Sequence, residues 1–208
     1  MNHYDLFERT SECEKFGVKS NLPSADSCSG VYIFGSDEQF EVKTIMGQGG
    51  SARVFRCVDS NNNQCALKVI RNEKKFNNDK VEKMIAKEYY ISSILGNHPN
   101  ILKCHAVEMM GKITAKNTIQ DAKFNVLEIA QNGSLFRFIK STGAVEENLA
   151  KFMFYQLANA VEFMHSQLIA HFDIKLDNIL LDEYFNIKLA DFGTAEILES
   201  SETQLKFK

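Results

Sequence analysis

A change in hydrophobic periodicity constrains the fold more than any other feature of this chain. Three short runs of β-like composition, at 40–46, 53–58 and 64–70, are separated by a glycine-rich turn and by a polar cluster. Residues 80–95 then carry apolar side chains at mostly helical spacing. This stretch ends at 96–99, Gly-Asn-His-Pro, where glycine and proline stop a helix. The pattern predicts three antiparallel strands followed by one long helix.

The pattern changes again further along the chain. Two more β-like runs, at 101–109 and 123–129, flank a polar stretch at 112–121. Residues 146–167 then carry apolar side chains at steps of three and four, which predicts a long amphipathic helix. The order of these elements favours an α+β fold.

Two lobes follow from this order. We expect a five-stranded antiparallel N-terminal lobe with one helix at about 39–130, and the start of a mainly helical second lobe at 131–208. Together they would form one partial domain, 39–208. Residues 1–38 lack sustained periodicity, so we expect them to form a flexible N-terminal extension.

Composition excludes several classes of function. A net charge of -3 provides no basic field for a run of phosphates, so nucleic acid is not an expected partner. The first residues lack a signal-peptide pattern, and no apolar stretch approaches the length of a membrane span. The 5 cysteines contain no CxxC pair, so we expect reduced thiols and a cytoplasmic, or possible nuclear, location.

A glycine-rich segment lies between the first two predicted strands, where backbone without a Cβ could approach a phosphate closely. Taken alone, such a segment is more often a simple hairpin turn. A dinucleotide-binding loop is disfavoured, because a strand and not a helix follows. The residues concerned are Gly47, Gln48, Gly49, Gly50, Ser51, Ala52 and Val54.

Lys68 lies within the apolar run Ala66-Leu67-Lys68-Val69-Ile70. A buried ammonium is costly unless a partner compensates it, and Glu88 on the following helix is a candidate. The alternative is that Lys68 extends its charge into solvent from an outer strand.

Two later motifs distinguish these readings. Residues 171–178 read His-Phe-Asp-Ile-Lys-Leu-Asp-Asn, and Asp191-Phe192-Gly193 follows a short apolar run. With the glycine-rich loop, the strand lysine and the helix glutamate, they stand in the order and spacing typical of protein kinases. From about residue 40 onward, the sequence resembles the protein kinase family.

The resemblance implies a role for each polar residue of the set. Asp173 would accept or orient the proton of the substrate hydroxyl. Asn178 and Asp191 would hold Mg²⁺ against the phosphates of ATP, as hard oxygen donors suited to that ion. Lys68, paired with Glu88, would bind the α- and β-phosphates. Lys175 would steady the γ-phosphate, and a lysine there implies a protein substrate with a Ser or Thr acceptor.

The resemblance also implies an adenine site between the lobes. Met46, Val54 and Ala66 would cover one face of the ring, and Leu180 the other. The hinge would be Glu128-Ile129-Ala130, whose backbone groups would form hydrogen bonds to the adenine edge. Leu127 would limit access to the pocket behind the adenine. Ordinary core packing is the alternative for each apolar residue alone.

The sequence departs from the family pattern in three ways. Ala52 replaces the third glycine of the loop, and Phe172 replaces the arginine that usually precedes the catalytic aspartate. The latter change removes a cation that would pair with an activation-loop phosphate. Finally, the printed sequence stops inside the activation segment, before the A-P-E motif and the later helices. On that basis we expect the apolar face of 146–167 to lack its usual cover.

Two functions are therefore expected. The first is an ATP-dependent serine/threonine protein kinase. The alternative is a catalytically inactive, truncated kinase-like fragment that binds nucleotide or partner proteins. A small-molecule phosphotransferase of related fold fits less well, because the loop at 171–178 is closer to the protein kinase form.

Overall fold

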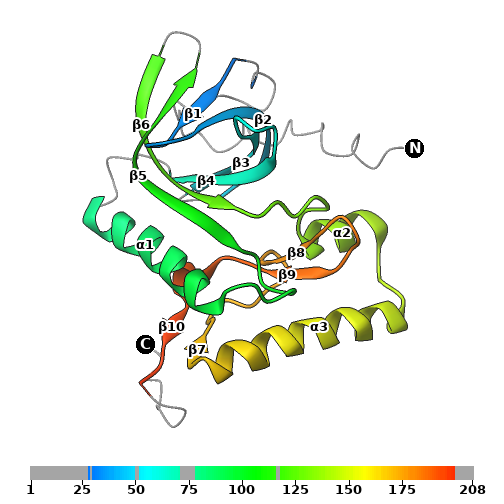
Figure 1. Ribbon diagram of the computed structural model, residues 1–208. Helices are drawn as coiled ribbons and strands as arrows, with labels where there is room; N and C mark the ends of the chain where they lie inside the picture. The colour runs from blue at the N-terminus through cyan, green and yellow to red at the C-terminus, as the bar shows by residue number, and fades with distance from the viewer. Residues whose placement is uncertain (1–27, 29, 50–51, 71–77, 116–117, 200–208) are drawn as a thin grey trace.

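A computed structural model describes residues 28, 30–49, 52–70, 78–115 and 118–199. Figure 1 shows a twisted sheet at one end of the molecule, a helical layer at the other, and α1 beside the sheet. The sheet is a closed antiparallel barrel with strand order β1-β2-β3-β4-β6-β5. Its strands are β1 (Tyr32–Phe34), β2 (Gln39–Gln48), β3 (Ala52–Val58), β4 (Gln64–Ile70), β5 (Cys104–Ala115) and β6 (Thr118–Leu127).

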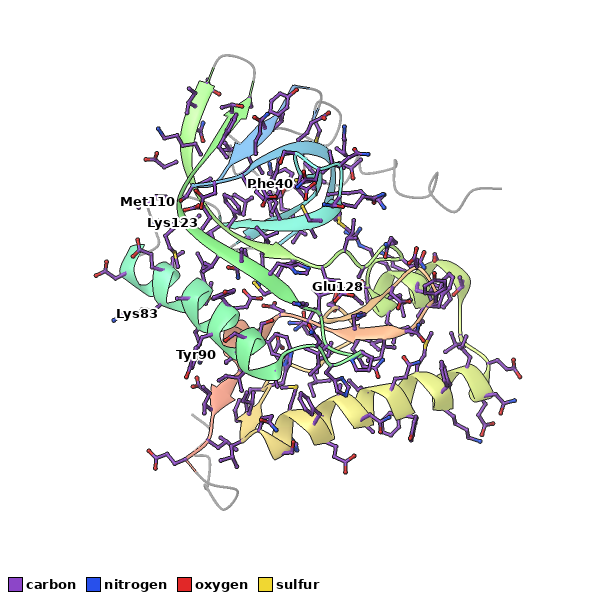
Figure 2. The ribbon with its side chains drawn as sticks, in the orientation of Figure 1. Phe40, Lys83, Tyr90, Met110, Lys123 and Glu128 are labelled. Atoms are coloured by element: carbon purple, nitrogen blue, oxygen red, sulfur yellow. The ribbon has the colours of Figure 1, made fainter. Side chains whose placement is uncertain are left out.

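Alternation of apolar and polar side chains builds the barrel core. In β3 the alternate residues Phe55 and Cys57 are fully buried, because successive side chains of a strand point to opposite faces. Phe40, labelled in Figure 2, meets Phe124 in the barrel core in a T-shaped contact, with ring centroids 6.0 Å apart. This cluster makes the barrel a rigid support for the residues that its strands carry.

The barrel contains one strand more than the sequence pattern predicts. β1 falls within the segment 1–38, for which we expected a flexible extension, and pairs with both β2 and β5. Its Ile33 is fully buried, so this part of the segment belongs to the barrel core. Residues 1–27 lie outside the described residues.

The prediction of a polar connection at 112–121 is also wrong. β5 and β6 extend through this stretch and pair as far as Ala115 and Thr118. Among the described residues of this stretch Ile113 alone is buried, so its polar composition gives no sign of the two strands.

Helix α1 (Asn78–Leu95) joins the two cores of the molecule. Near its middle, Ile85 packs with Ile70 and Ala52 of the barrel. At its C-terminal end, Ile91 and Leu95 pack into the core of the second lobe. The helix is therefore held from both sides.

The second lobe contains the helices α2 (Leu135–Thr142) and α3 (Glu147–Ser166). It also contains two pairs of short strands, β7 (Ile169–Ala170) with β10 (Glu196–Ile197) and β8 (Ile179–Leu181) with β9 (Ile187–Leu189). The 3₁₀ turn η4 (Phe192–Thr194) lies against α1. Ser134 caps α2 by accepting a hydrogen bond from the Arg137 N–H. In Figure 1 the β8–β9 hairpin lies between the barrel and α3.

A buried polar network fixes α3 to that hairpin. The Gln156 side chain accepts a hydrogen bond from the Ile187 N–H at 2.8 Å and from the Asn100 amide at 3.2 Å. The Asn100 amide also donates to the Ile187 carbonyl at 3.1 Å. Because these buried groups satisfy one another, they specify how the hairpin sits on α3.

The far side of α3 is exposed. Phe154 is 70% and Tyr155 65% exposed, whereas Met153, Ala160 and Met164 on the other side are buried. Met153, Ala160 and Met164 belong to the apolar pattern of 146–167, so the expectation that this face lacks its cover does not hold for them. Among these residues there is no helix long and apolar enough to cross a membrane.

Candidate active site

Lys68 of β4 lies at the centre of the site and contacts two carboxylates. Its Nζ lies 2.9 Å from both carboxylate oxygens of Glu88 on α1 and 2.8 Å from Oδ1 of Asp191. Glu88 is 5% exposed, so the contact is shielded from solvent. The structure brings these three residues together and places Lys68 in the interior, not in solvent.

The charges at this point stabilise one another. Burial alone would lower the pKa of Lys68, but Glu88 and Asp191 outweigh burial and raise that pKa above its ordinary value. Burial raises the pKa of Asp191, but the Lys68 ammonium, together with the Gly193 N–H and His171, outweighs burial and lowers it. The lysine is therefore a fixed cation at neutral pH and Asp191 a fixed anion, a balance suited to a ligand that carries both phosphates and a metal ion.

The loop at 171–178 presents a second group of polar side chains. Asp173 Oδ2 accepts hydrogen bonds from Lys175 Nζ at 2.7 Å and from the Asn178 amide at 2.9 Å. The Lys175 hydrogen bond is the main cause that lowers the pKa of Asp173. The carboxylate is therefore ionised and can accept a proton or a hydrogen bond from a hydroxyl group.

His171 and Phe172, at the start of this loop, support its backbone conformation. The His171 Nε2 lies 3.0 Å from the Ala190 carbonyl, and Nδ1 accepts the Asp173 N–H at 3.2 Å. Burial lowers the pKa of His171, in keeping with a neutral ring that donates at one nitrogen and accepts at the other. Phe172 has φ 63°, a left-handed backbone conformation that is strained for an aromatic residue.

Backbone bonds connect the two groups. The Ala190 N–H donates to the Asn178 carbonyl at 2.8 Å, so the strand before Asp191 runs beside the loop. Asp191 itself has φ 67° and ψ 74°, and the following Phe192 is buried beside the His171 ring. The side chains of Lys68, Asp173, Asn178 and Asp191 thus converge from β4 and two adjoining loops.

The glycine-rich hairpin connects β2 and β3. Gly47 pairs with Val54 and Gln48 with Arg53, and the Gly49 N–H donates to the Ala52 carbonyl at 2.9 Å. The Ala52 methyl group packs with Ile70 and Ile85, so only its backbone could contact a ligand. Gly50 and Ser51, also expected in this site, lie outside the described residues.

An apolar cluster lies between the barrel and the second lobe. It contains six residues that the resemblance assigned to the adenine site: Met46, Val54, Ala66, Leu127, Ala130 and Leu180. The sequence reasoning missed four other members: Tyr89, Leu102, Cys104 and Ala190. Burial raises the pKa of the Cys104 thiol to about 12, so this cysteine is an inert apolar group.

Glu128 uses its side chain and its N–H to hold the connection between the lobes. Its carboxylate pairs with Lys188 of β9 at 2.5 Å, and its N–H donates to the Lys103 carbonyl at 2.9 Å. Among the polar groups of Glu128, the carbonyl oxygen is therefore the one available to accept a hydrogen bond from a ligand. In Figure 2 Glu128 lies between the barrel and the β8–β9 hairpin. Arg137 adds a second link, because its guanidinium donates to the Met46 carbonyl at 3.2 Å.

The donor set fits Mg²⁺ shared with phosphates. The Asn178 amide NH₂ is engaged by Asp173, which leaves its oxygen as the possible ligand, and Asp191 adds a carboxylate. Magnesium usually takes one or two such protein oxygens and completes its shell with phosphate and water. Among the described residues there is no cluster of three or more His, Cys, Asp or Glu that could hold a metal without a substrate.

Asn125 is the polar residue near Lys68 that the sequence reasoning missed. It lies on β6 directly opposite Lys68, is 1% exposed, and donates to Glu88 Oε2 at 3.1 Å. A single asparagine in an apolar strand gives a weak signal. Only the pairing register brings it to the same face as the lysine.

Comparison with known proteins agrees with this arrangement. The profile of the protein kinase domain matches residues 40–208, and the chain therefore belongs to the protein kinase family. CBL-interacting protein kinase 11 of Oryza sativa subsp. japonica is 36% identical over 168 residues, which cover 78% of this chain and 30% of that protein.

Other relatives are serine/threonine kinases by name. Serine/threonine-protein kinase SIK1 of Mus musculus is 34% identical over 164 residues, covering 78% of this chain and 20% of that protein. Testis-specific serine/threonine-protein kinase 4 of Homo sapiens is 27% identical over 181 residues, covering 87% and 52%. The chain thus spans from about a fifth to about half of the length of these relatives.

Proposed function

We propose that this chain carries the ATP site and the catalytic centre of a serine/threonine protein kinase, which transfers the γ-phosphate of Mg·ATP to Ser or Thr hydroxyls of a protein. The observation that supports it most is the convergence of Lys68, paired with Glu88, and Asp191 beside a loop that presents Asp173, Lys175 and Asn178. Phosphoryl transfer requires positioning and neutralisation of charge, and this set supplies both.

Each residue has a definite task in this proposal. Lys68 binds the α- and β-phosphates, and Glu88 holds it in place. Asp173 orients the acceptor hydroxyl and takes its proton, while Lys175 steadies the γ-phosphate. Asn178 and Asp191 hold the metal ion. When bound, Mg·ATP supplies the phosphoryl group and a divalent charge that offsets the negative charge spread over it.

The adenine ring occupies the apolar cluster between the lobes. Met46, Val54 and Ala66 cover one face and Leu180 the other, with Leu127 behind. The Glu128 carbonyl and the Ala130 backbone bind its polar side. Gly47, Gln48, Gly49 and the adjoining hairpin residues cover the phosphates with their backbone.

The cellular setting proposed is the cytoplasm or the nucleus. The described cysteines Cys28, Cys57, Cys65 and Cys104 are all free and buried, as suits a reducing compartment. The chain's net charge of -3 is consistent with a protein substrate and not nucleic acid.

Phosphate transfer by the 208-residue chain provides the direct test. We expect transfer from Mg·ATP to Ser or Thr of a generic basic protein. Asp173→Asn should reduce the rate by about 10²–10⁴-fold while ATP affinity stays unchanged, because Asp173 acts on the hydroxyl and not on the nucleotide. Asp177→Asn, an exposed aspartate of the same loop, is the matched control and should retain activity.

Two results would contradict the proposal in different ways. If the chain binds ATP in a Mg-dependent manner but transfers no phosphate, the alternative of a nucleotide- or partner-binding fragment is supported. If ATP does not bind at all, the assignment of the nucleotide site is wrong.

A further inference from the structure

Asn125 is buried between the barrel and α1, beside the Lys68–Glu88 pair. Its side chain lies on β6, opposite Lys68, and the whole residue is 1% exposed. Its amide nitrogen lies 3.1 Å from Glu88 Oε2. The orientation of the amide follows from chemistry, since a carboxylate paired with an ammonium only accepts hydrogen bonds and must face the NH₂ group.

This orientation leaves a buried acceptor without a partner. Asn125 Oδ1 is the buried side-chain atom that has no hydrogen bond among the described residues. An unpaired buried acceptor destabilises a fold, and an apolar residue of the same shape would avoid that cost. Neighbouring residues of β6, Phe124 and Val126, are buried and apolar. The asparagine is therefore a polar exception in its strand, and its one bond is to Glu88.

The bond joins two elements that carry different parts of the site. Glu88 belongs to α1, whereas Asn125 is fixed in the rigid barrel. Lys68 contacts both Glu88 and Asp191, so its ammonium alone does not hold Glu88 in one position. Asn125 donates to Glu88 Oε2, which Lys68 also contacts, and holds this oxygen from the sheet independently of where Lys68 points.

We propose that Asn125 is a positioning residue for nucleotide binding: it fixes Glu88 so that Lys68 stays oriented toward the phosphates. The inference rests on the proposed function, since it assigns Lys68 and Glu88 to the nucleotide site. When the phosphates and the metal engage Lys68 and Asp191, the Asn125 bond keeps α1 docked against the barrel. The asparagine thus contributes to nucleotide affinity at the expense of stability.

Replacing Asn125 is therefore expected to change nucleotide affinity and stability in opposite directions. Asn125→Leu has the same branching but no polar atoms, so the unliganded chain should unfold at an equal or higher denaturant concentration than wild type. Its dissociation constant for Mg·ATP should rise about tenfold, equivalent to about 1.4 kcal/mol. A residue with only a structural role would change stability and affinity in the same direction.

A double-mutant cycle tests whether Asn125 affects nucleotide affinity through Glu88. In the Glu88→Gln background, Asn125→Leu should cause no further loss of affinity, because the anchored carboxylate is already absent. Asn100→Leu is a control at another buried asparagine, whose amide hydrogen bonds are satisfied. It should lower the denaturation midpoint, opposite to Asn125→Leu.

The outcomes separate this inference from the proposed function. Absence of Mg·ATP binding by the wild-type chain overturns both. Normal wild-type binding with unchanged affinity in Asn125→Leu overturns the inference alone. Asn125→Val, smaller and favourable in strands, repeats the measurement if leucine overpacks the site. A lower denaturation midpoint in both apolar variants would assign Asn125 to the fold and overturn the inference.

Discussion

Lys68 is the residue on which the charge balance of the site depends. Its side chain is 15% exposed and faces Glu88, which has even less access to water. Lys68→Met would leave a buried carboxylate without its cation, so we expect a loss of about 3–5 kcal/mol in the free energy of unfolding. Urea denaturation measures this change.

Lys151→Met is the matched control for that substitution. Lys151 pairs with Glu147 on the exposed surface of α3, where an ion pair contributes little. The free energy of unfolding of Lys151→Met should equal that of wild type within error. A similar loss in both variants would show that Lys68 has no special role in the fold.

His98 makes stability depend on pH between neutrality and mild acid. Its Nδ1 accepts the Asn100 N–H at 3.1 Å, and its ring stacks on Phe163 with centroids 4.9 Å apart. Burial, with a smaller effect from Lys188, lowers the pKa of His98 below 6.5. A depressed pKa favours the neutral ring in the folded state. The stability that the neutral His98 ring contributes is therefore present above pH 6.5 and is lost as the pH falls through the pKa of His98 in the folded state.

The variant His98→Phe keeps the stacking contact and removes the titrating group. We expect it to weaken the fall in stability between about pH 7 and 5, although His105 and His171, whose pKa values are also lowered, retain part of it. Denaturation midpoints across this range give the slope. His165→Gln, at an exposed position on α3, should retain the wild-type slope, and an unchanged slope in His98→Phe would refute the assignment.

Single residues of the site could be predicted from the sequence where they belong to a motif of fixed spacing. Lys68, Asp173, Asn178 and Asp191 stand at fixed spacings that phosphoryl transfer requires, and the structure brings them together. Asn125 and the Glu128–Lys188 pair could not be predicted, because strand register and chain crossing create those contacts. The roles of all these residues stay predictions until they are measured.

At the scale of elements, the β5 bulge depends on Gly111. The pairing register of β5 with β6 shifts between Glu108 and Gly111. A Cβ on Gly111 would lie 2.5 Å from the Phe124 ring and 2.7 Å from the Phe34 carbonyl. The backbone oxygen cannot move away as a flexible side chain could, so Gly111→Ala should destabilise the chain by about 1–3 kcal/mol.

Gly47→Ala is the control for this substitution, because a Cβ on Gly47 meets no atom within 4 Å. Its thermal midpoint should be at or slightly above that of wild type, since glycine is unfavourable in a strand. Equal midpoints for the two variants would show that β5 relaxes around the added methyl group.

Elements were predicted well where their burial follows a simple period. β4 and the helices α1 and α3 have long apolar patterns, and the predicted bounds agree within two residues. β1 has three residues, too few for a period to emerge, and the β5–β6 hairpin is largely solvated. β1 and the outer part of the β5–β6 hairpin, within 112–121, were missed because long-range pairing, and not local composition, determines them.

At the scale of the whole molecule, the proposed ligand contacts both lobes. Mg·ATP at about 100 times its dissociation constant should add about 2.7 kcal/mol to the free energy of unfolding, because it binds only the folded chain. Chelation of Mg²⁺ should remove most of this gain. A thermal shift with and without EDTA measures it.

Asp191→Asn should abolish the magnesium-dependent part of that stabilisation, because it removes the carboxylate assigned to the metal. Asp121→Asn, at an exposed position on β6, is a control that should respond to Mg·ATP as wild type does. A normal magnesium-dependent shift in Asp191→Asn would contradict the metal assignment.

Closure of the barrel has a consequence for how copies of this chain can meet. β1 bonds to β2 on one side and to β5 on the other, so it covers the backbone N–H and C=O groups of residues 39–41 and 112–114 that would otherwise form a free edge. Such edges are the templates on which a second chain adds as an extra strand. The three-residue strand β1 thus blocks intermolecular β-pairing at this part of the barrel.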